Sequence, residues 1–253
     1  MPLFSGVGVA LVTLFRPDGA LDAPATAEHA ARLAALGVRC ILAAGTTGEA
    51  ATLTAAERDE LIAAVRAAVP ADVPVLAGTG GPTGRQAAEF TERAFANGAD
   101  AVLALSPPRV ADPRPYFDAI AKTATGPLLA YHFPNASQPG IPVELLPELP
   151  ISGLKDSSGD AARYLHERET FGGDLYTGAA SLLMLAGAVG TDGGLLAVAN
   201  SMPEDCVAAL AGDVEAQIRI AAADRTASAD FPAGHKRATA ARFGTSPMTR
   251  VGS

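Results

Sequence analysis

Lys155 is the residue of this sequence best placed to do chemistry. It ends the apolar run of residues 151–154 and is followed by a polar turn, residues 156–160. Only three of the nineteen basic residues are lysines, so the chain uses this side chain sparingly. Burial at a strand end would disfavour the ammonium form and lower the pKa of the amine. A free amine can attack a carbonyl carbon and form a Schiff base. Spacing alone leaves an ordinary surface lysine equally open.

A small polar loop follows an earlier apolar run. Its residues are Gly45, Thr46, Thr47, Gly48 and Glu49. The backbone amides and the two hydroxyls could hold a carboxylate or a phosphate, as glycine-rich anion cradles do. An ordinary turn, in which the threonines bond the local backbone, is the alternative and is favoured when the loop is taken alone.

Tyr131 ends a third apolar run and is followed by His132. A phenol at a strand end beside an amine is suited to proton transfer, although an aromatic ring packed at the mouth of a barrel would produce the same pattern. The four histidines are isolated, and no two of them have metal-ligand spacing, so the sequence predicts no metal site.

Two other segments resemble known functional motifs but lack residues that those motifs require. Residues 78–84 are rich in glycine, but Pro82 and the lack of a lysine exclude both a dinucleotide-binding loop and a P-loop. Ser157 and Ser158 lie in no Gly-x-Ser-x-Gly turn, so a serine hydrolase is not indicated.

The elements that must position these residues follow an alternating pattern of strands and helices. Eight short apolar runs, most without polar alternation, are separated by longer segments, most of them Ala-rich and helical; this predicts parallel strands covered by helices. Because active sites of such barrels lie at the carboxyl ends of the strands, the residues after each run are the informative ones. The fold expected is a TIM-type (β/α)8 barrel of the α/β class. Its predicted strands are residues 7–13, 40–44, 74–78, 101–105, 128–131, 152–155, 175–178 and 194–197.

Helix signals divide the chain into a barrel and an extension. Thr54 and Glu57 form a capping box that begins a predicted helix over residues 55–68. We expect the barrel to occupy residues 1–213, and a short C-terminal helical extension, residues 214–253, to pack on it. Within that extension residues 215–227 are predicted to be helical, and residues 228–253, which include Pro232, Gly234, Gly244 and Pro247, to be less regular.

Composition excludes several functions. A chain of 253 residues with 49% hydrophobic residues matches one barrel domain. A net charge of -8 argues against nucleic-acid binding. Cys40 and Cys206 form no CxxC pair, which favours free thiols. Lacking an apolar run long enough to span a membrane and a leader pattern, the protein is expected to be soluble and cytoplasmic.

Three motifs together resemble the dihydrodipicolinate synthase and N-acetylneuraminate lyase family. They are the loop of residues 45–49, Tyr131 with Pro134, and the segment of residues 153–156, in the family's order and approximate spacing. A fourth match, residues 190–193 followed by Ala199 and Asn200, falls at the eighth predicted strand. The resemblance extends from about residue 6 to about residue 213.

The resemblance implies a class I aldolase or lyase that acts on pyruvate or another 2-oxo acid without a metal or a separate cofactor. Lys155 would form the Schiff base, Tyr131 would transfer protons, and Thr46 and Thr47 would hold the pyruvate carboxylate and orient Tyr131. The expected catalytic residues are therefore Lys155, Tyr131 and Thr47. The expected substrate-binding residues are Thr46, Thr47, Gly48, Gly178 and Leu195. The resemblance also implies a homodimer or homotetramer.

Departures from the family pattern bear on the substrate. Family members that make dihydrodipicolinate carry paired tyrosines after the fourth strand, where this chain has residues 106–109, Ser-Pro-Pro-Arg. They also carry an arginine soon after the Tyr-x-x-Pro motif, where residues 135–138 contain no cation. A dicarboxylate substrate would therefore lack the tyrosine and arginine partners that it has in those family members. His132 replaces a common asparagine, and the roles of His132 and Arg109 stay open.

We therefore expect an aldolase that cleaves or forms a 2-oxo acid, from pyruvate and an aldehyde, with a sugar-acid type substrate favoured. Three alternatives stay open: 4-hydroxy-tetrahydrodipicolinate synthesis, dehydration of a sugar acid, and a barrel that binds a 2-oxo acid without turning it over.

Overall fold

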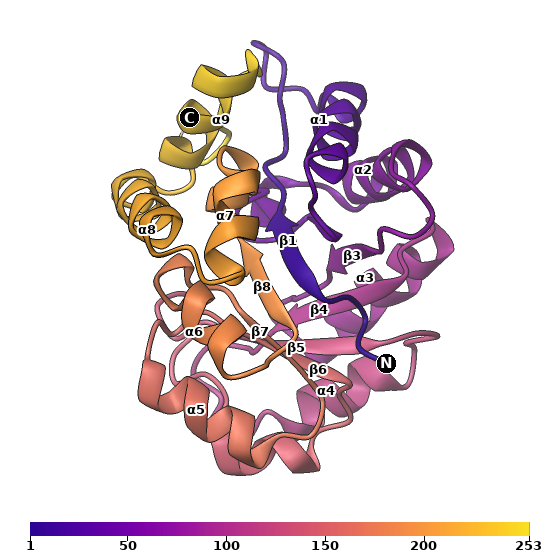
Figure 1. Cartoon of the computed structure of the whole chain (residues 1–253). Helices are drawn as coiled ribbons and strands as arrows, with labels where there is room; N and C mark the ends of the chain where they lie inside the picture. Colours follow the sequence, from indigo (N-terminus) through magenta and orange to yellow (C-terminus); the bar gives the residue numbers. More distant parts are fainter. Residues whose placement is uncertain (253) are drawn as a thin grey trace.

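Eight parallel strands form a closed barrel in chain order, with β1 hydrogen-bonded to β8 (Figure 1). The computed structural model describes residues 1–252. The predicted TIM barrel is thus confirmed. The strands are β1 (Gly6–Ala10), β2 (Cys40–Ala43), β3 (Val75–Gly78), β4 (Ala101–Leu105), β5 (Leu128–His132), β6 (Gly153–Asp156), β7 (Asp174–Thr177) and β8 (Gly193–Leu196).

Helices follow the strands on the outside of the barrel. The α-helices between β1 and the end of the barrel are α1 (Ala23–Ala35), α2 (Ala55–Ala68), α3 (Gly84–Ala96), α4 (Arg114–Ala121), α5 (Ala161–Thr170), α6 (Leu183–Ala188) and α7 (Pro203–Leu210). Short 3-10 helices are η1 (Ala50–Thr52), η2 (Val143–Glu148), η3 (Ala180–Leu182) and η4 (Val198–Asn200). The connection between β5 and β6 contains η2 and no α-helix. Pro147 lies inside η2, where it would interrupt an α-helix because proline cannot donate a helical hydrogen bond.

Two further helices follow the barrel, α8 (Val214–Ser228) and α9 (Ala233–Phe243). Figure 1 shows them beside α7, and α8 contacts both α7 and α9. The predicted helix of residues 215–227 corresponds to α8, but the expectation of an irregular chain after residue 228 is wrong over α9. Pro232 precedes the first turn, where proline costs no hydrogen bond. Gly234 lies against the backbone of Ala227, so its missing side chain lets the two helices approach closely.

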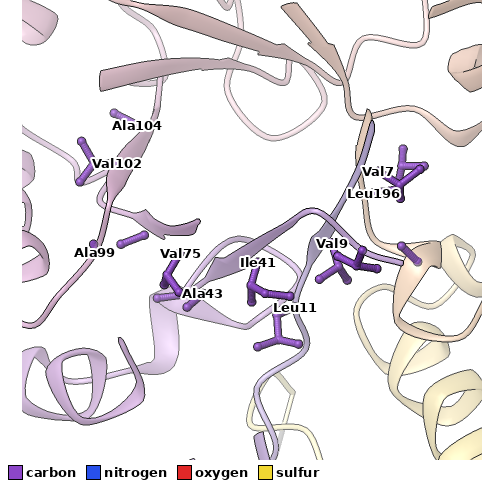
Figure 2. Packing of buried hydrophobic residues seen from close by; sticks show 14 of the residues in the cluster. Val7, Val9, Leu11, Ile41, Ala43, Val75, Ala99, Val102, Ala104 and Leu196 are labelled. Atoms are coloured by element: carbon purple, nitrogen blue, oxygen red, sulfur yellow. The ribbon is translucent and has the colours of Figure 1, made fainter. Parts of the chain in front are cut away.

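Apolar side chains form two layers, one on each face of the strands. Residues such as Val7, Val9, Ile41 and Val75 face the helices (Figure 2). The alternate positions fill the interior of the barrel: Ala10, Cys40, Leu42, Leu76, Ala101, Leu103, Leu129, Tyr131, Tyr176 and Leu195. Because side chains alternate along a strand, this arrangement decides which residues can point into the barrel.

Candidate active site

Lys155 points into the barrel. In the register of the sheet it lies between Tyr131 on β5 and Tyr176 on β7, and both tyrosines belong to the interior layer. Side chains in register on neighbouring strands share a face, whereas Leu154 and Asp156 take the opposite one. Only 4% of Lys155 is exposed. Among residues 1–252 it makes no ion pair with a carboxylate. Burial lowers the pKa of its amine to about 7.

Tyr131 lies beside this amine. The Lys155 Nζ lies 4.5 Å from the centre of the Tyr131 ring. Burial raises the pKa of the phenol to about 12, although hydrogen bonds with Ser157 and Thr46 lower it in part. The phenol is therefore protonated at neutral pH and can pass a proton on only through a partner that accepts one. Ser157 and Thr46 are such partners, since a hydroxyl both donates and accepts.

The loop after β2 brings two threonines to the carboxyl end of the barrel. Thr46 hydrogen-bonds Tyr131, so of the two threonines expected to orient the phenol, Thr46 is the one in contact with it. Thr47 is buried. The carbonyl of Gly48 accepts a hydrogen bond of 2.7 Å from the Thr13 hydroxyl. A Cβ on Gly48 would lie only 2.9 Å from the Leu11 carbonyl oxygen, which explains the glycine.

Ser157 is a site residue that the sequence analysis missed. It follows Lys155 and Asp156, its backbone N–H donates to the His132 carbonyl at 2.8 Å, and its hydroxyl contacts the Tyr131 phenol. The signal was its position directly after the strand that carries the amine. A search for a hydrolase motif could not detect it, because here the hydroxyl is a partner of the phenol.

Gly178 leaves space for the side chains of Lys155 and Ser157. A Cβ at this position would lie 2.7 Å from Lys155 Cε and would overlap the Ser157 hydroxyl. Leu195 lies fully buried in the barrel interior on β8. Of the expected site residues, Thr46 and Tyr131 line the cavity described below, whereas Lys155, Thr47, Gly48, Gly178 and Leu195 do not. The structure thus brings Lys155, Tyr131, Thr46 and Gly178 together, with Thr47 and Gly48 on the adjoining loop.

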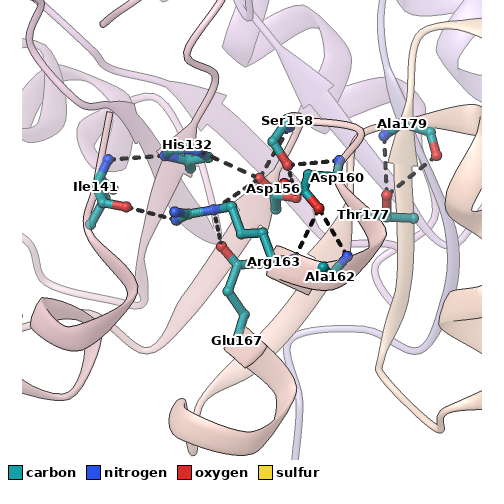
Figure 3. A network of polar contacts seen from close by, with 10 residues as sticks. All are labelled: His132, Ile141, Asp156, Ser158, Asp160, Ala162, Arg163, Glu167, Thr177 and Ala179. Carbon is teal, nitrogen blue, oxygen red and sulfur yellow. Dashed lines mark hydrogen bonds and ion pairs between the residues drawn. The ribbon is translucent and has the colours of Figure 1, made fainter. Parts of the chain in front are cut away.

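A polar network on the outer face of β5 and β6 holds the strand that carries Tyr131 (Figure 3). His132 Nδ1 accepts a hydrogen bond of 2.9 Å from Ile141 N, and its Nε2 lies 3.9 Å from Asp156 Oδ1. Arg163 on α5 donates to the Ile141 carbonyl at 2.7 Å. Burial lowers the pKa of His132 to about 4, so the ring is neutral at pH 7. With Nδ1 as acceptor, the proton is assigned to Nε2, on the side of Asp156. His132 therefore helps to hold β5 in place from the outer face of the barrel, and its ring does not enter the barrel interior.

Glu167 is a buried carboxyl in this network. Its Oε1 lies 2.8 Å from Arg163 Nε, in an ion pair whose geometry is not that of a hydrogen bond. Burial and, to a smaller extent, the charge of Asp156 raise its pKa from 4.5 to about 8. Asp156 also has a raised pKa, chiefly through burial. Two buried acids therefore share one guanidinium.

Replacing Glu167 with Gln should change how stability depends on pH. Between pH 4.5 and 8 folded Glu167 holds a proton that the unfolded chain has released, so wild-type stability falls as pH rises through this window and levels off above it. Urea unfolding at several pH values should show a flatter slope for Glu167→Gln, whereas the exposed neighbour Glu169→Gln should follow the wild type. Equal slopes for wild type and Glu167→Gln would show that Glu167 is already ionised in the folded protein.

A cavity of about 670 Å³ opens over the carboxyl ends of β2 to β5. Thr46 and Tyr131 form one part of its wall, Arg58 is its cation, and Phe231, Pro232 and Val251 come from the C-terminal part of the chain. Its other lining residues are Ala44, Gly45, Glu49, Ala50, Ala51, Leu53, Gly78, Gly80, Gly81, Pro82, Gln86, Phe90, Leu103, Leu105, Ser106, Pro107, Pro108 and Ala136. Arg109, exposed and in the left-handed region with a φ of 63°, is not part of this wall.

Two further features of residues 1–252 bear on chemistry and location. No three His, Cys, Asp or Glu side chains in this range are grouped so that they could hold a metal ion. Every helix in the same range is too short or too polar to cross a membrane.

Comparison with known proteins gives consistent matches. The family model described as the dihydrodipicolinate synthetase family matches residues 3–229. A 4-hydroxy-tetrahydrodipicolinate synthase of Methanosarcina mazei is 34% identical over 228 residues, which are 84% of this chain and 78% of that protein. The structure of YagE, a prophage protein of the dihydrodipicolinic acid synthase family from E. coli K12 in complex with pyruvate, has a TM-score of 0.90, 25% identity and coverage of 99% and 93% of the two chains. Dihydrodipicolinate synthase DapA-2 of Bacillus anthracis has a TM-score of 0.85, 26% identity and coverage of 99% and 95%.

Proposed function

Because the chain belongs to the dihydrodipicolinate synthetase family, whose members are lyases of the class I aldolase type, we propose that it joins pyruvate to an aldehyde, or splits the product, through a Schiff base on Lys155. The resemblance seen in the sequence is thereby confirmed, and the protein is an enzyme. The non-catalytic barrel considered above has no support from these relatives.

The observation that carries the proposal is the buried amine of Lys155, which lies beside the Tyr131 ring and has no carboxylate partner among residues 1–252. The neutral amine attacks the keto carbon of pyruvate, and loss of water gives an iminium ion. The iminium is an electron sink, so a proton leaves the adjacent methyl carbon and an enamine forms. The enamine carbon attacks the aldehyde, and hydrolysis of the new iminium returns the amine. No metal or separate cofactor is needed for these steps.

Tyr131 is proposed to move protons in these steps. Its phenol is protonated at neutral pH, so it can donate to the departing oxygen and be restored through Thr46 or Ser157. Thr46, Thr47 and Gly48 are proposed to hold the pyruvate carboxylate with hydroxyl and backbone N–H donors, which favour an anion. Gly178 keeps room for the amine. For Leu195 we retain only an indirect role as a filler of the barrel interior.

The names of the relatives bear on the second substrate. They favour 4-hydroxy-tetrahydrodipicolinate synthesis, an alternative in the sequence analysis, over the sugar-acid substrate first expected. We therefore propose aspartate semialdehyde as the aldehyde. A sugar-acid type reaction remains the second candidate, because residues 135–138 contain no cation for a second carboxylate. Arg58 lines the cavity, but its guanidinium donates to the carbonyls of Gly78 and Ala50.

One assay separates the candidates. Wild-type protein is incubated with pyruvate and either aspartate semialdehyde or glyceraldehyde, and the products are followed by NMR. Pyruvate consumption with aspartate semialdehyde alone supports the synthase. Consumption with glyceraldehyde alone supports the sugar-acid reaction. A third incubation contains a sugar acid alone, and loss of water with the carbon skeleton uncut would indicate the dehydratase. Consumption of none of these substrates would contradict the proposal.

Gly178→Ala should impair the enzyme without unfolding it. The added methyl group would displace the Lys155 Cε and the Ser157 hydroxyl, and a misplacement of about 1 Å can cost on the order of a hundredfold in rate. We expect kcat to fall at least about tenfold. Gly172→Ala is the matched control, because nothing lies within 4 Å of the methyl group it adds. Unchanged kcat in Gly178→Ala would show that the amine has room to move.

Pyruvate binding is supported by the pyruvate complex of YagE. The homodimer or homotetramer and the cytoplasmic location expected from the sequence stay predictions, which size-exclusion chromatography and cell fractionation would test.

A further inference from the structure

Glu49 is the last residue of the loop after β2. It follows Thr46, Thr47 and Gly48, which are proposed to bind the carboxylate. Its backbone is in the left-handed region with a φ of 54°, and 2% of it is exposed. The Glu49 N–H donates to the Thr46 carbonyl at 3.1 Å. The position of Glu49 therefore determines the backbone position of the loop.

Within residues 1–252, the Glu49 carboxylate is bound by groups from the C-terminal part of the chain. It forms an ion pair with Lys236 on α9, in which both side chains are fully buried. Its Oε2 also accepts hydrogen bonds from the backbone N–H groups of Arg250 at 2.7 Å and Val251 at 2.9 Å. About 200 residues of sequence separate the carboxylate from these donors, since the separations are 201 and 202.

The donors are themselves fixed. Lys236 donates to the Met248 carbonyl at 2.7 Å and lies 4.2 Å from the centre of the Phe15 ring. Arg250 pairs with Glu57 of α2, and its guanidinium donates to the Thr52 carbonyl at 3.1 Å and the Gly19 carbonyl at 2.7 Å. The C-terminal segment, residues 248–251, is thus bound to α9, to η1 and to the loop after β1.

The same segment reaches the cavity. Val251 lines the cavity together with Thr46 and Tyr131, and Phe231 and Pro232, which precede α9, line it too. A buried ion pair adds little net stability, because desolvation of the two charges offsets their attraction, but the removal of one partner leaves a buried charge uncompensated. Here Glu49 is the residue directly after Gly48, so a disturbance of the pair reaches residues 46–48 through the covalent backbone.

We infer that Lys236 and the C-terminal segment are positioning elements of the active site, because they hold Glu49 and thereby fix residues 46–48 for the pyruvate carboxylate. This inference rests on the proposed function. Lys236 does not touch the reacting atoms. Its contribution should therefore appear in the affinity for pyruvate and not in the reactivity of Lys155.

The test compares Lys236→Met with Arg237→Met. Arg237 is the next residue on α9 and pairs with Asp230 at the surface, where both side chains are more than half exposed. Trapping with cyanoborohydride is measured against pyruvate concentration. Lys236→Met should raise the half-saturating pyruvate concentration at least about tenfold, which corresponds to about 1.4 kcal/mol of binding free energy. The trapping rate at saturating pyruvate should stay within about twofold of the wild type. Arg237→Met should match the wild type.

Glu49→Gln and the double variant show whether the two side chains act as a pair. If they do, Lys236→Met with Glu49→Gln should raise the half-saturating concentration by less than the product of the single effects. An unchanged half-saturating concentration in folded Lys236→Met would overturn the inference.

A second pair of variants keeps the test open if Lys236→Met does not fold. Val251→Pro removes the N–H that donates to Glu49, and Val251→Ala keeps it. The Val251 side chain is half exposed, and thermal unfolding checks that both variants fold. Val251→Ala controls for the loss of the side chain at the cavity wall, so Val251→Pro should weaken pyruvate binding more than Val251→Ala does. Equal binding by the two variants would contradict the inference. Failure of the proposed function itself would look different, because the wild type would then not be trapped with pyruvate at all.

Discussion

Lys155→Ala should lose turnover almost completely, with kcat/KM reduced at least about a thousandfold, because the covalent intermediate needs an amine at this position. The folded structure should survive, since the change removes a buried amine that has no ion-pair partner among residues 1–252. Steady-state kinetics with pyruvate and the preferred aldehyde measure the loss, and thermal unfolding monitors the fold.

The matched control is Lys122→Ala. Lys122 is exposed at the end of α4, outside the barrel interior, and its loss should leave kcat/KM within about twofold of the wild type. A folded Lys155→Ala protein with more than a tenth of the wild-type kcat/KM would exclude the Schiff-base mechanism.

The second large effect is the pH dependence of Schiff-base formation. Only the neutral amine attacks a carbonyl, so the rate should rise as pH increases through the pKa of Lys155 and then level off. Burial lowers that pKa from 10.5 to about 7, so about half of the protein carries a neutral amine at pH 7. An ordinary lysine would have on the order of one part in three thousand neutral at this pH. Burial thus raises the fraction of neutral, reactive amine at pH 7 roughly a thousandfold.

Initial trapping rates with saturating pyruvate and cyanoborohydride, measured from pH 5.5 to 9.5, test this expectation. We expect a single rise centred near pH 7 and a plateau above pH 8. The rate of unfolding over the same range serves as the control for stability. A rate that still climbs steeply at pH 9 would mean that the folded protein keeps Lys155 as an ordinary ammonium ion.

The barrel could be predicted from the sequence because buried parallel strands are short and apolar on both faces. The predicted ends of the strands were less accurate. The first predicted strand ran to Thr13, whereas β1 ends at Ala10. Residues 11–14 are nevertheless buried. An apolar pattern in the sequence indicates burial, whereas a strand ends where its hydrogen bonds to the neighbouring strands end.

The helical end of the chain was harder to predict. Pro232 and Gly234 suggested irregular structure, but the proline occupies a helix start and the glycine a close contact between α8 and α9. The capping box of Thr54 and Glu57 predicted α2 with the bounds that the structure has. Local signals were reliable where local hydrogen bonds decide the structure, and failed where packing decides it.

The candidate site divides in the same way. Lys155, Tyr131 and Thr46 stand at strand ends, and their convergence follows from the barrel topology. The contact between Ser157 and the phenol depends on side-chain geometry that spacing does not encode. The contacts of Glu49 with Lys236 and Arg250 join segments some 200 residues apart, and no local pattern in a single sequence indicates such a contact.

The most direct test of the central claim is a trapping experiment read by mass spectrometry. Wild-type protein is incubated with pyruvate and borohydride, digested, and mapped over its three lysines, Lys122, Lys155 and Lys236. We predict one reduced pyruvyl adduct, on Lys155, and none after pyruvate is omitted. An unmodified protein, or an adduct on Lys122 or Lys236 in place of Lys155, would contradict the account.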